Sequence, residues 1–217
     1  SKAKLYSNKY YVGGVAGYTS GTVQNVYSAA DSIIGEATGG YSNVGRKGAL
    51  FGLIASGATT QNAYFDSKVA GLSVAVAIDS SSANTVNVGG LTTANMQRDQ
   101  FAWQLNTMAS SQENSKIWSR ANGYPIFADA NNLPTMRVTF DDDGASTRKY
   151  TNNKGIVAMP DDPEPASGYK FVSWVKENGD VFTGKQKVSA DMIVSALYAS
   201  SAEQKYVVSF EYPEDNE

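Results

Sequence analysis

Carboxylates are the side chains of this chain best suited to chemistry, because the sequence contains no histidine and no cysteine. Those absences remove the usual general base, the commonest zinc ligand, thiolate nucleophiles and disulfides. The densest acidic group is Asp141-Asp142-Asp143, which raises the hypothesis of a calcium site, since hard cations prefer clustered carboxylate oxygens. No glutamate follows at the twelfth position of an EF-hand loop, so the pattern favours a solvated turn.

The other candidate chemical groups have equally plain interpretations. Asp161-Asp162 and Glu164 lie among prolines and indicate a polar loop. A carboxylate pair hydrolyses glycosides only when it faces a cleft, whereas these acidic residues fall in expected turns. The Gly14-x-x-Gly17 pattern has no following Lys-Ser/Thr and no helix, which disfavours a phosphate loop. We therefore expect no enzyme activity, no catalytic residue, no cofactor and no metal site, and the sequence leaves any ligand-binding residues unknown.

Tyrosines concentrate near the start of the chain and are the best candidates for a binding surface. Exposed aromatic rings stack on sugars or fill a partner's pocket. The alternative, which we favour, is that they lie half-buried between stacked strands, because tyrosine is common in strands. The residues concerned are Tyr6, Tyr10, Tyr11, Tyr18, Tyr27 and Tyr41.

Composition limits the classes of partner. The 217 residues carry a net charge of −3 with no run of Lys and Arg, which argues against nucleic acid and anionic membranes. No stretch approaches the roughly 20 apolar residues that span a bilayer, so we expect no membrane insertion. The chain opens almost directly on a repeat, without a signal sequence, and we interpret it as a fragment of a longer polypeptide.

A repeated unit organises the first part of the chain. Residues 13–27 have a weaker copy at 48–64, in which Asn25 and Asn62 are 37 positions apart but Gly17 and Gly52 only 35, indicating an insertion near Ala55. Short glycine-cut strands bury a face only when copies stack, which predicts a short β-solenoid. A sandwich of hairpins is the competing architecture. Residues 66–90 are interpreted as the rim of this stack.

A helix over residues 93–106 is expected next, with Thr92 or Thr93 as its N-cap. Its apolar stripe of Phe101, Leu105 and Met108 suits a helix that covers the open end of the stack. The aromatic residues of the segment Gly123–Phe127 are expected to pack against this helix. We therefore expect a mainly β chain, with residues 1–133 forming a solenoid closed by a helical cap.

The residue pattern changes after the polar segment 131–134, and residues 134–203 are predicted to form a second, small β domain. Strands are expected at 136–140, 169–175 and 192–199, with a hairpin turn at Glu177–Asp180. Phe171 and Trp174 are three apart, so either a bulge turns both rings inward or one ring packs beneath the proline-rich connection; we favour the second. Residues 204–217 are a linker or the start of another repeat.

Two stretches resemble known repeats. Residues 10–65, with Gly13-Gly14-Val15-Ala16-Gly17-Tyr18 followed by Gly21-Thr22-Val23-Gln24-Asn25-Val26-Tyr27, resemble the GLUG motif of bacterial cell-surface proteins. Residues 136–199 resemble the Listeria–Bacteroides repeat of internalin-type surface proteins. The matching positions are Val138-Thr139-Phe140, Gly144, the Pro160/Pro163 pair, Gly168-Tyr169-Lys170-Phe171-Val172-Ser173-Trp174 and Leu197-Tyr198-Ala199.

These resemblances imply a β-grasp-like second domain and a secreted, cell-surface role in a bacterial repeat protein. The function they imply is a non-catalytic stalk or adhesion scaffold, its partners being neighbouring domains of the same polypeptide and a host surface protein or glycan. The alternative is an accessory, non-catalytic region of a large secreted peptidase or glycosidase. Signal and anchor segments would then lie outside these residues.

Overall fold

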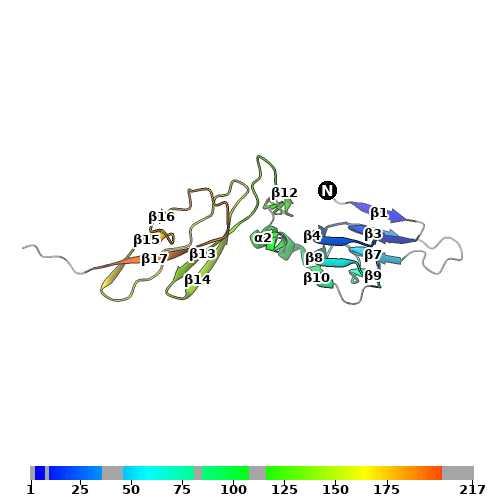
Figure 1. Ribbon diagram of the computed structural model, residues 1–217, viewed down its shortest axis with the longest axis horizontal. Helices are drawn as coiled ribbons and strands as arrows, with labels where there is room; N and C mark the ends of the chain where they lie inside the picture. Colours follow the sequence, from blue (N-terminus) through cyan, green and yellow to red (C-terminus); the bar gives the residue numbers. More distant parts are fainter. Residues whose placement is uncertain (1–2, 8–9, 36–45, 81–84, 108–115, 202–217) are drawn as a thin grey trace, which may run out of the picture.

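The computed structural model describes residues 3–7, 10–35, 46–80, 85–107 and 116–201, and the fold is mainly β. Figure 1 shows two groups of strands on either side of helix α2. The first group comprises β1 (Lys4–Ser7), β2 (Tyr11–Gly13), β3 (Ala16–Thr19), β4 (Thr22–Ser28), β5 (Ser32–Gly35), β6 (Arg46–Gly48), β7 (Phe51–Ile54), β8 (Thr59–Asp66), β9 (Val76–Asp79) and β10 (Thr85–Leu91).

Every strand pairing within β1–β10, in the part of the chain described, is parallel. The alternative of a hairpin sandwich is therefore wrong, because hairpins pair antiparallel strands. Strands β4, β8 and β10 form one sheet and β3, β7 and β9 another, so three successive layers of chain lie in register. The third layer, β9 and β10, was expected only as a rim.

The two extra residues of the second layer lie where the sequence placed them. Tyr18 pairs with Leu53 at a spacing of 35, whereas Thr22 pairs with Thr59 at a spacing of 37. Between these pairs, a turn closes with the amide of Ala58 donating to the carbonyl of Ala55 at 3.1 Å. The predicted insertion near Ala55 is thus confirmed, and the register is restored after the turn.

Packing between layers explains the burial of the middle layer. Ala49, Leu50, Phe51 and Ile54 are fully buried because chain lies on both sides of them. Gly48 belongs to the same layer, and a Cβ there would meet the carbonyl oxygens of Phe51 and of Ala75, the latter at 2.7 Å. Glycine is required here for close backbone approach rather than for a positive φ.

We expect Gly48→Ala to lower the free energy of unfolding by about 3 kcal/mol, because backbone atoms must move to admit the methyl group. The matched control is Gly21→Ala, where nothing lies within 4 Å of the added Cβ and the change should stay within about 0.5 kcal/mol. Urea unfolding followed by circular dichroism measures both. Equal losses in the two variants would show that layer spacing is not the constraint.

The expected single helix over 93–106 is wrong in detail, because two helices occupy the segment. They are α1 (Thr93–Met96) and α2 (Asp99–Thr107), and Thr92 caps α1 by accepting from the amide of Asn95 at 3.2 Å. In one straight helix, Met96 would point well away from Phe101, since five residues correspond to about 140° beyond a full turn. The break at 97–98 lets both side chains enter one buried cluster. Met108 lies outside the described residues.

The second group of strands forms one five-stranded sheet in the order β14-β13-β17-β15-β16. Its strands are β13 (Arg137–Asp142), β14 (Ala145–Tyr150), β15 (Tyr169–Val175), β16 (Val181–Phe182) and β17 (Met192–Ser200), and a short pair, β11 (Trp118–Ser119) with β12 (Ile126–Phe127), precedes it. The sequence predicted β15 with its observed bounds and β13 and β17 except for their end residues, and it missed β14. The hairpin turn is also confirmed, with the amide of Lys176 bonded to the carbonyl of Asp180 at 2.9 Å.

A β-bulge between Phe171 and Ser173 shifts the register of β15 against β17. The rings of Phe171 and Trp174 therefore face the same core, with centroids 5.5 Å apart in an edge-to-face contact. Our expectation that they lie on opposite sides is wrong, because the bulge adds one residue and restores a common face. Both rings pack with Val138, Phe140 and Val194.

Candidate functional site

Helix α2 lies between the two groups of strands and presents a different face to each (Figure 1). Phe101 and Leu105 are four residues apart, so they share one face, which is buried against the parallel strands. Trp103 falls about 200° around the helix from Phe101 and points toward the five-stranded sheet. The amphipathic stripe predicted from the sequence thus covers only one of two contact faces.

The parallel-strand face of α2 is an aromatic cluster. Phe101 makes edge-to-face contacts with Tyr27 and Tyr64, with ring centroids 5.9 and 5.7 Å apart. Tyr27 lies on β4 and Tyr64 is its in-register partner on β8, so the helix crosses two layers. It lies along the side of the stack, which differs from the plug expected over the end. Tyr27 and Tyr64 explain this position, because their rings pack against Phe101 of the helix.

Stacked asparagines connect the same face to the helix. Asn25, Asn62 and Asn87 occupy equivalent positions in the three layers, all with positive φ, at 57°, 54° and 54°. Asn62 is buried, and its amide donates to the side-chain oxygen of Asn25 at 2.8 Å and to the carbonyl of Gln104 at 3.0 Å. The 37-residue spacing in the sequence therefore marks a hydrogen-bonded ladder that also holds α2.

The opposite face of α2 contacts the five-stranded sheet through Trp103. Its indole N–H donates to Oδ2 of Asp191 at 2.8 Å, while the backbone amide of Arg137 donates to Oδ1 of the same carboxylate at 2.9 Å. The Arg137 guanidinium carbon lies 4.7 Å from the centre of the Trp103 ring, and the ring of Tyr150 lies 5.5 Å away. One side chain of the helix thus engages three strands or strand ends of the second group.

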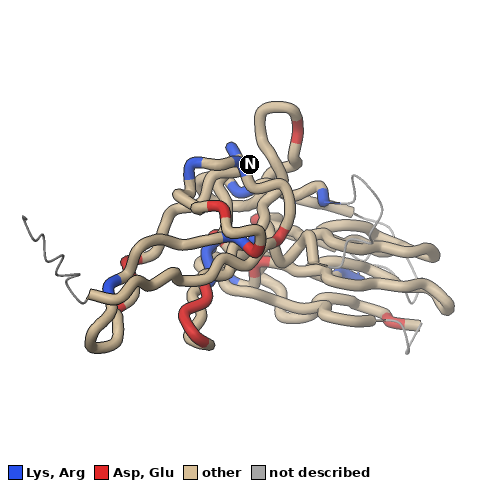
Figure 2. The backbone as a smooth tube through the Cα atoms, turned by 60° about the vertical axis from the view of Figure 1, so that its left-hand side comes forward, with Lys and Arg blue, Asp and Glu red and all other residues tan. Residues whose placement is uncertain are grey.

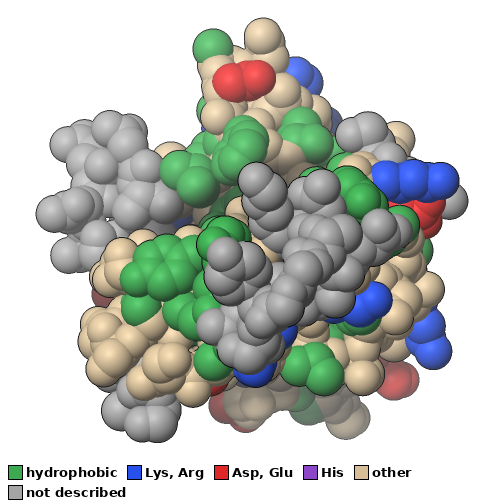
Figure 3. Space-filling model, turned by 90° about the vertical axis from the view of Figure 1, so that its right-hand side faces the viewer, with side chains coloured by type: hydrophobic (Ala, Val, Ile, Leu, Met, Phe, Trp, Pro, Cys, Tyr) green, Lys and Arg blue, Asp and Glu red, His purple; other side chains and the backbone are tan. Residues whose placement is uncertain are grey.

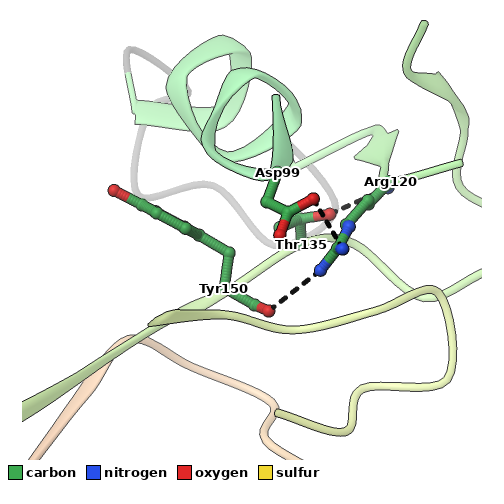
Figure 4. Close-up of polar contacts among 4 residues, drawn as sticks. All are labelled: Asp99, Arg120, Thr135 and Tyr150. Atoms are coloured by element: carbon green, nitrogen blue, oxygen red, sulfur yellow. Dashed lines mark hydrogen bonds and ion pairs between the residues drawn. The ribbon is translucent and has the colours of Figure 1, made fainter. Parts of the chain in front are cut away.

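A buried asparagine and an arginine complete the connection. Asn106 donates to the carbonyl of Trp118 at 2.8 Å and accepts from the amide of Trp118 at 3.0 Å. The amide of Arg120 donates to Oγ1 of Thr135 at 2.9 Å. Figure 4 shows its guanidinium between the Asp99 carboxylate, with which it forms an ion pair, and the carbonyl of Tyr150.

We call this set of contacts the junction. It brings together side chains that are separated in the sequence by as many as 88 residues. Sequence reasoning predicted the helix but missed the polar residues, because their partners are distant and no local pattern marks them. The residues of the junction are Asp99, Trp103, Asn106, Trp118, Arg120, Thr135, Arg137, Tyr150 and Asp191.

A buried carboxylate lies at the edge of the aromatic cluster. Tyr124 donates its hydroxyl to Oδ2 of Asp66 at 2.6 Å. Burial raises the pKa of Tyr124, and the hydrogen bond to the Asp66 carboxylate raises it further, to about 12. Burial alone would raise the pKa of Asp66, but hydrogen bonds from Tyr124, Thr93 and the amides of Lys68 and Val69 outweigh it and lower that pKa.

We expect this pair to make the folded protein less stable at alkaline pH. The phenol of Tyr124 has an ordinary pKa of 10.0 and a folded pKa of about 12, so its contribution to stability is complete below pH 10 and is lost between pH 10 and 12. We expect Tyr124→Phe to be less stable than wild type at pH 8 but to lose less stability between pH 10 and 12. Urea unfolding at pH 8, 10 and 11 measures this. An unchanged pH dependence in Tyr124→Phe would contradict the assignment.

The acidic residues singled out in the sequence lie away from the junction. Asp143 and Gly144 form the tight turn between β13 and β14, both with positive φ, and Asp142 accepts a hydrogen bond from the Tyr198 hydroxyl at 2.6 Å. Asp161, Asp162 and Glu164 are exposed on the connection between β14 and β15. Within the described ranges, no three acidic side chains converge in a way that would hold a metal ion.

The tyrosines divide into two kinds. Tyr11 and Tyr27 are half-buried, as the stacking hypothesis predicts. Tyr6, Tyr10 and Tyr18 are 59%, 54% and 56% exposed, so for these three the hypothesis of half-buried ladder residues is wrong. Figure 3, which views the parallel-strand end of the molecule, shows hydrophobic side chains exposed among polar ones. Tyr41 lies outside the described residues.

Comparison with known proteins adds no family to this geometry: no family model matches the chain, and no curated protein matches it either. In the described part of the chain, neither helix is long and apolar enough to cross a membrane. The functional argument therefore rests on the junction and on the arrangement of the strands.

Proposed function

We propose that this chain is a non-catalytic, extracellular spacer module of a bacterial surface protein. Its first part is a short β-solenoid, with α2 along its side, and its second part is a β-grasp-like domain. The solenoid is supported by the in-register parallel layers and by the Asn25–Asn62 ladder. The β-grasp-like domain is supported by the parallel pairing of its first and last long strands, β13 and β17, in the middle of the sheet.

The observation that carries the proposal is the junction. Domains joined by a flexible linker move independently, whereas a spacer must hold its two ends in a fixed relation. Here one helix packs a buried aromatic face on the first part, and it anchors Trp103 to Asp191 of the second. Asn106, buried between α2, β11 and the connecting segment at Thr135, fixes the chain where a linker would otherwise bend.

The extracellular, bacterial assignment rests on the resemblances to cell-surface repeats and on the low charge of the parallel strands. An antibody raised against the chain should label intact cells of the bacterium that encodes it, and protease treatment of those cells should remove the signal. Labelling that requires cell lysis would contradict the assignment. The prediction of no catalysis is checked with panels of peptide and glycoside substrates, on which purified chain should show no turnover.

A further inference from the structure

A pocket of about 560 Å³ opens beside the junction, between the start of α2 and the end of β14. Its wall includes Arg98 and Asp99 from the helix end, Arg120, and Arg148, Lys149 and Tyr150 from the edge strand β14. These residues come from three separate stretches of the sequence, which is why no basic run predicted the site. Figure 4 shows part of this wall, the side chains of Asp99, Arg120 and Tyr150.

Positive charge is concentrated in this pocket. Arg98, Arg120, Arg148 and Lys149 line it together with a single carboxylate, Asp99. Asp99 pairs with Arg120, while Arg98, Arg148 and Lys149 have no carboxylate within ion-pair distance among the described residues. The whole chain has a net charge of −3, and Figure 2 shows few charged residues along the parallel strands. Bringing four cations together raises their mutual repulsion, which a bound anion relieves.

One cation of the pocket is already held in place. Arg120 is fixed by its backbone bond to Thr135, by Asp99 and by the carbonyl of Tyr150. Around this fixed guanidinium, Arg98 and Arg148 are both exposed, and they line the pocket from the start of α2 and from β14. Guanidinium groups bind sulfate and carboxylate through paired N–H donors. Several guanidinium groups around one pocket therefore suit a small, rigid molecule that bears sulfate or carboxylate groups.

We propose that this pocket binds an anionic oligosaccharide, one whose sulfate or carboxylate groups contact Arg98 and Arg148. Its volume lies within the range of small-molecule sites and suits a few sugar units. Nucleic acid is disfavoured, because it requires an extended basic surface, whereas the chain as a whole is acidic. The choice of a sugar over other anions rests on the proposed extracellular function, while the charge argument stands without it.

Calorimetric titration with a heparin-derived tetrasaccharide tests the proposal at two salt concentrations. We expect binding by the wild-type chain that weakens as salt is raised. Arg98→Gln and Arg148→Gln should each weaken binding about tenfold, because each removes one charge-assisted contact. The matched control is Lys185→Gln, which removes one exposed charge from the same half of the molecule but outside the pocket, and it should change affinity less than about twofold.

Three results would overturn the proposal. The first is no binding of the tetrasaccharide by the wild-type chain. The second is a loss of affinity in Lys185→Gln equal to that in the pocket variants, which would show nonspecific electrostatic attraction in place of a binding site. Tighter binding of inorganic tripolyphosphate than of the tetrasaccharide would assign the pocket to phosphate instead of to a glycan. None of these variants alters Trp103, Asn106 or Asp191, so a failure here is distinguishable from a failure of the spacer function.

Discussion

Asn62→Ala should lower the free energy of unfolding by about 3 kcal/mol, the largest effect we expect from a single polar substitution in the parallel layers. The side chain is 1% exposed and joins Asn25 on the neighbouring layer to the carbonyl of Gln104 on α2. Alanine would leave the buried Asn25 side-chain oxygen and the part-buried Gln104 carbonyl without their donor, and it would also sit at a positive φ that alanine tolerates poorly.

The ladder provides its own control. Asn87 has the same φ of 54° as Asn62 but is exposed on the last layer. Asn87→Ala should therefore carry only the backbone cost, about 1 kcal/mol. Chemical unfolding of both variants under the same conditions measures the difference. If the two variants lose the same stability, the buried hydrogen bonds contribute nothing and the ladder has no structural role.

Trp103→Ala is the second large effect, because Trp103 is the main side chain of α2 that faces the five-stranded sheet. The substitution removes the hydrogen bond to Asp191, the stacking of Arg137 and the contact with Tyr150. We expect a loss of about 3 kcal/mol from a charged hydrogen bond and a cation–π contact. We also expect the wild type to unfold in one transition and Trp103→Ala to unfold in two, since the halves lose their coupling.

Trp103→Phe separates the two contributions. It keeps an aromatic ring for Arg137 and Tyr150 but has no N–H for Asp191, so we expect about half of the loss and a transition that stays single. Differential scanning calorimetry distinguishes one transition from two. A Trp103→Ala protein that still unfolds in one transition, with wild-type stability, would show that the halves are coupled elsewhere.

The sequence predicted the features that depend on local pattern. Parallel layers followed from the glycine-cut repeat, the insertion near Ala55 from its spacing, and the strands of the second sheet from alternation. The third layer was missed because β10 retains Asn87 of the repeated motif but little else, at a spacing of 25 from Asn62. The bulge in β15 is not the arrangement that we favoured from the sequence, although the three-residue spacing of Phe171 and Trp174 is a signal for it.

The junction was not predictable in the same way. Its hydrogen bonds join residues such as Trp103 and Asp191, which no periodicity relates. The break between α1 and α2 was not predictable either. It allows Met96 and Phe101 to be buried in one cluster, and that cluster exists only in the folded protein. Tertiary contacts that fix one half of the chain against the other leave little trace in a single sequence.

A distance measurement between the two halves tests the rigid-spacer account most directly. The chain has no cysteine, so Ser20→Cys and Glu177→Cys, both at exposed positions, place one spin label on each half. Double electron–electron resonance should give a single narrow distance distribution for this pair, and the same pair with Trp103→Ala and Asp191→Ala should give a broad one. A broad distribution from the labelled chain with its junction intact would contradict the account.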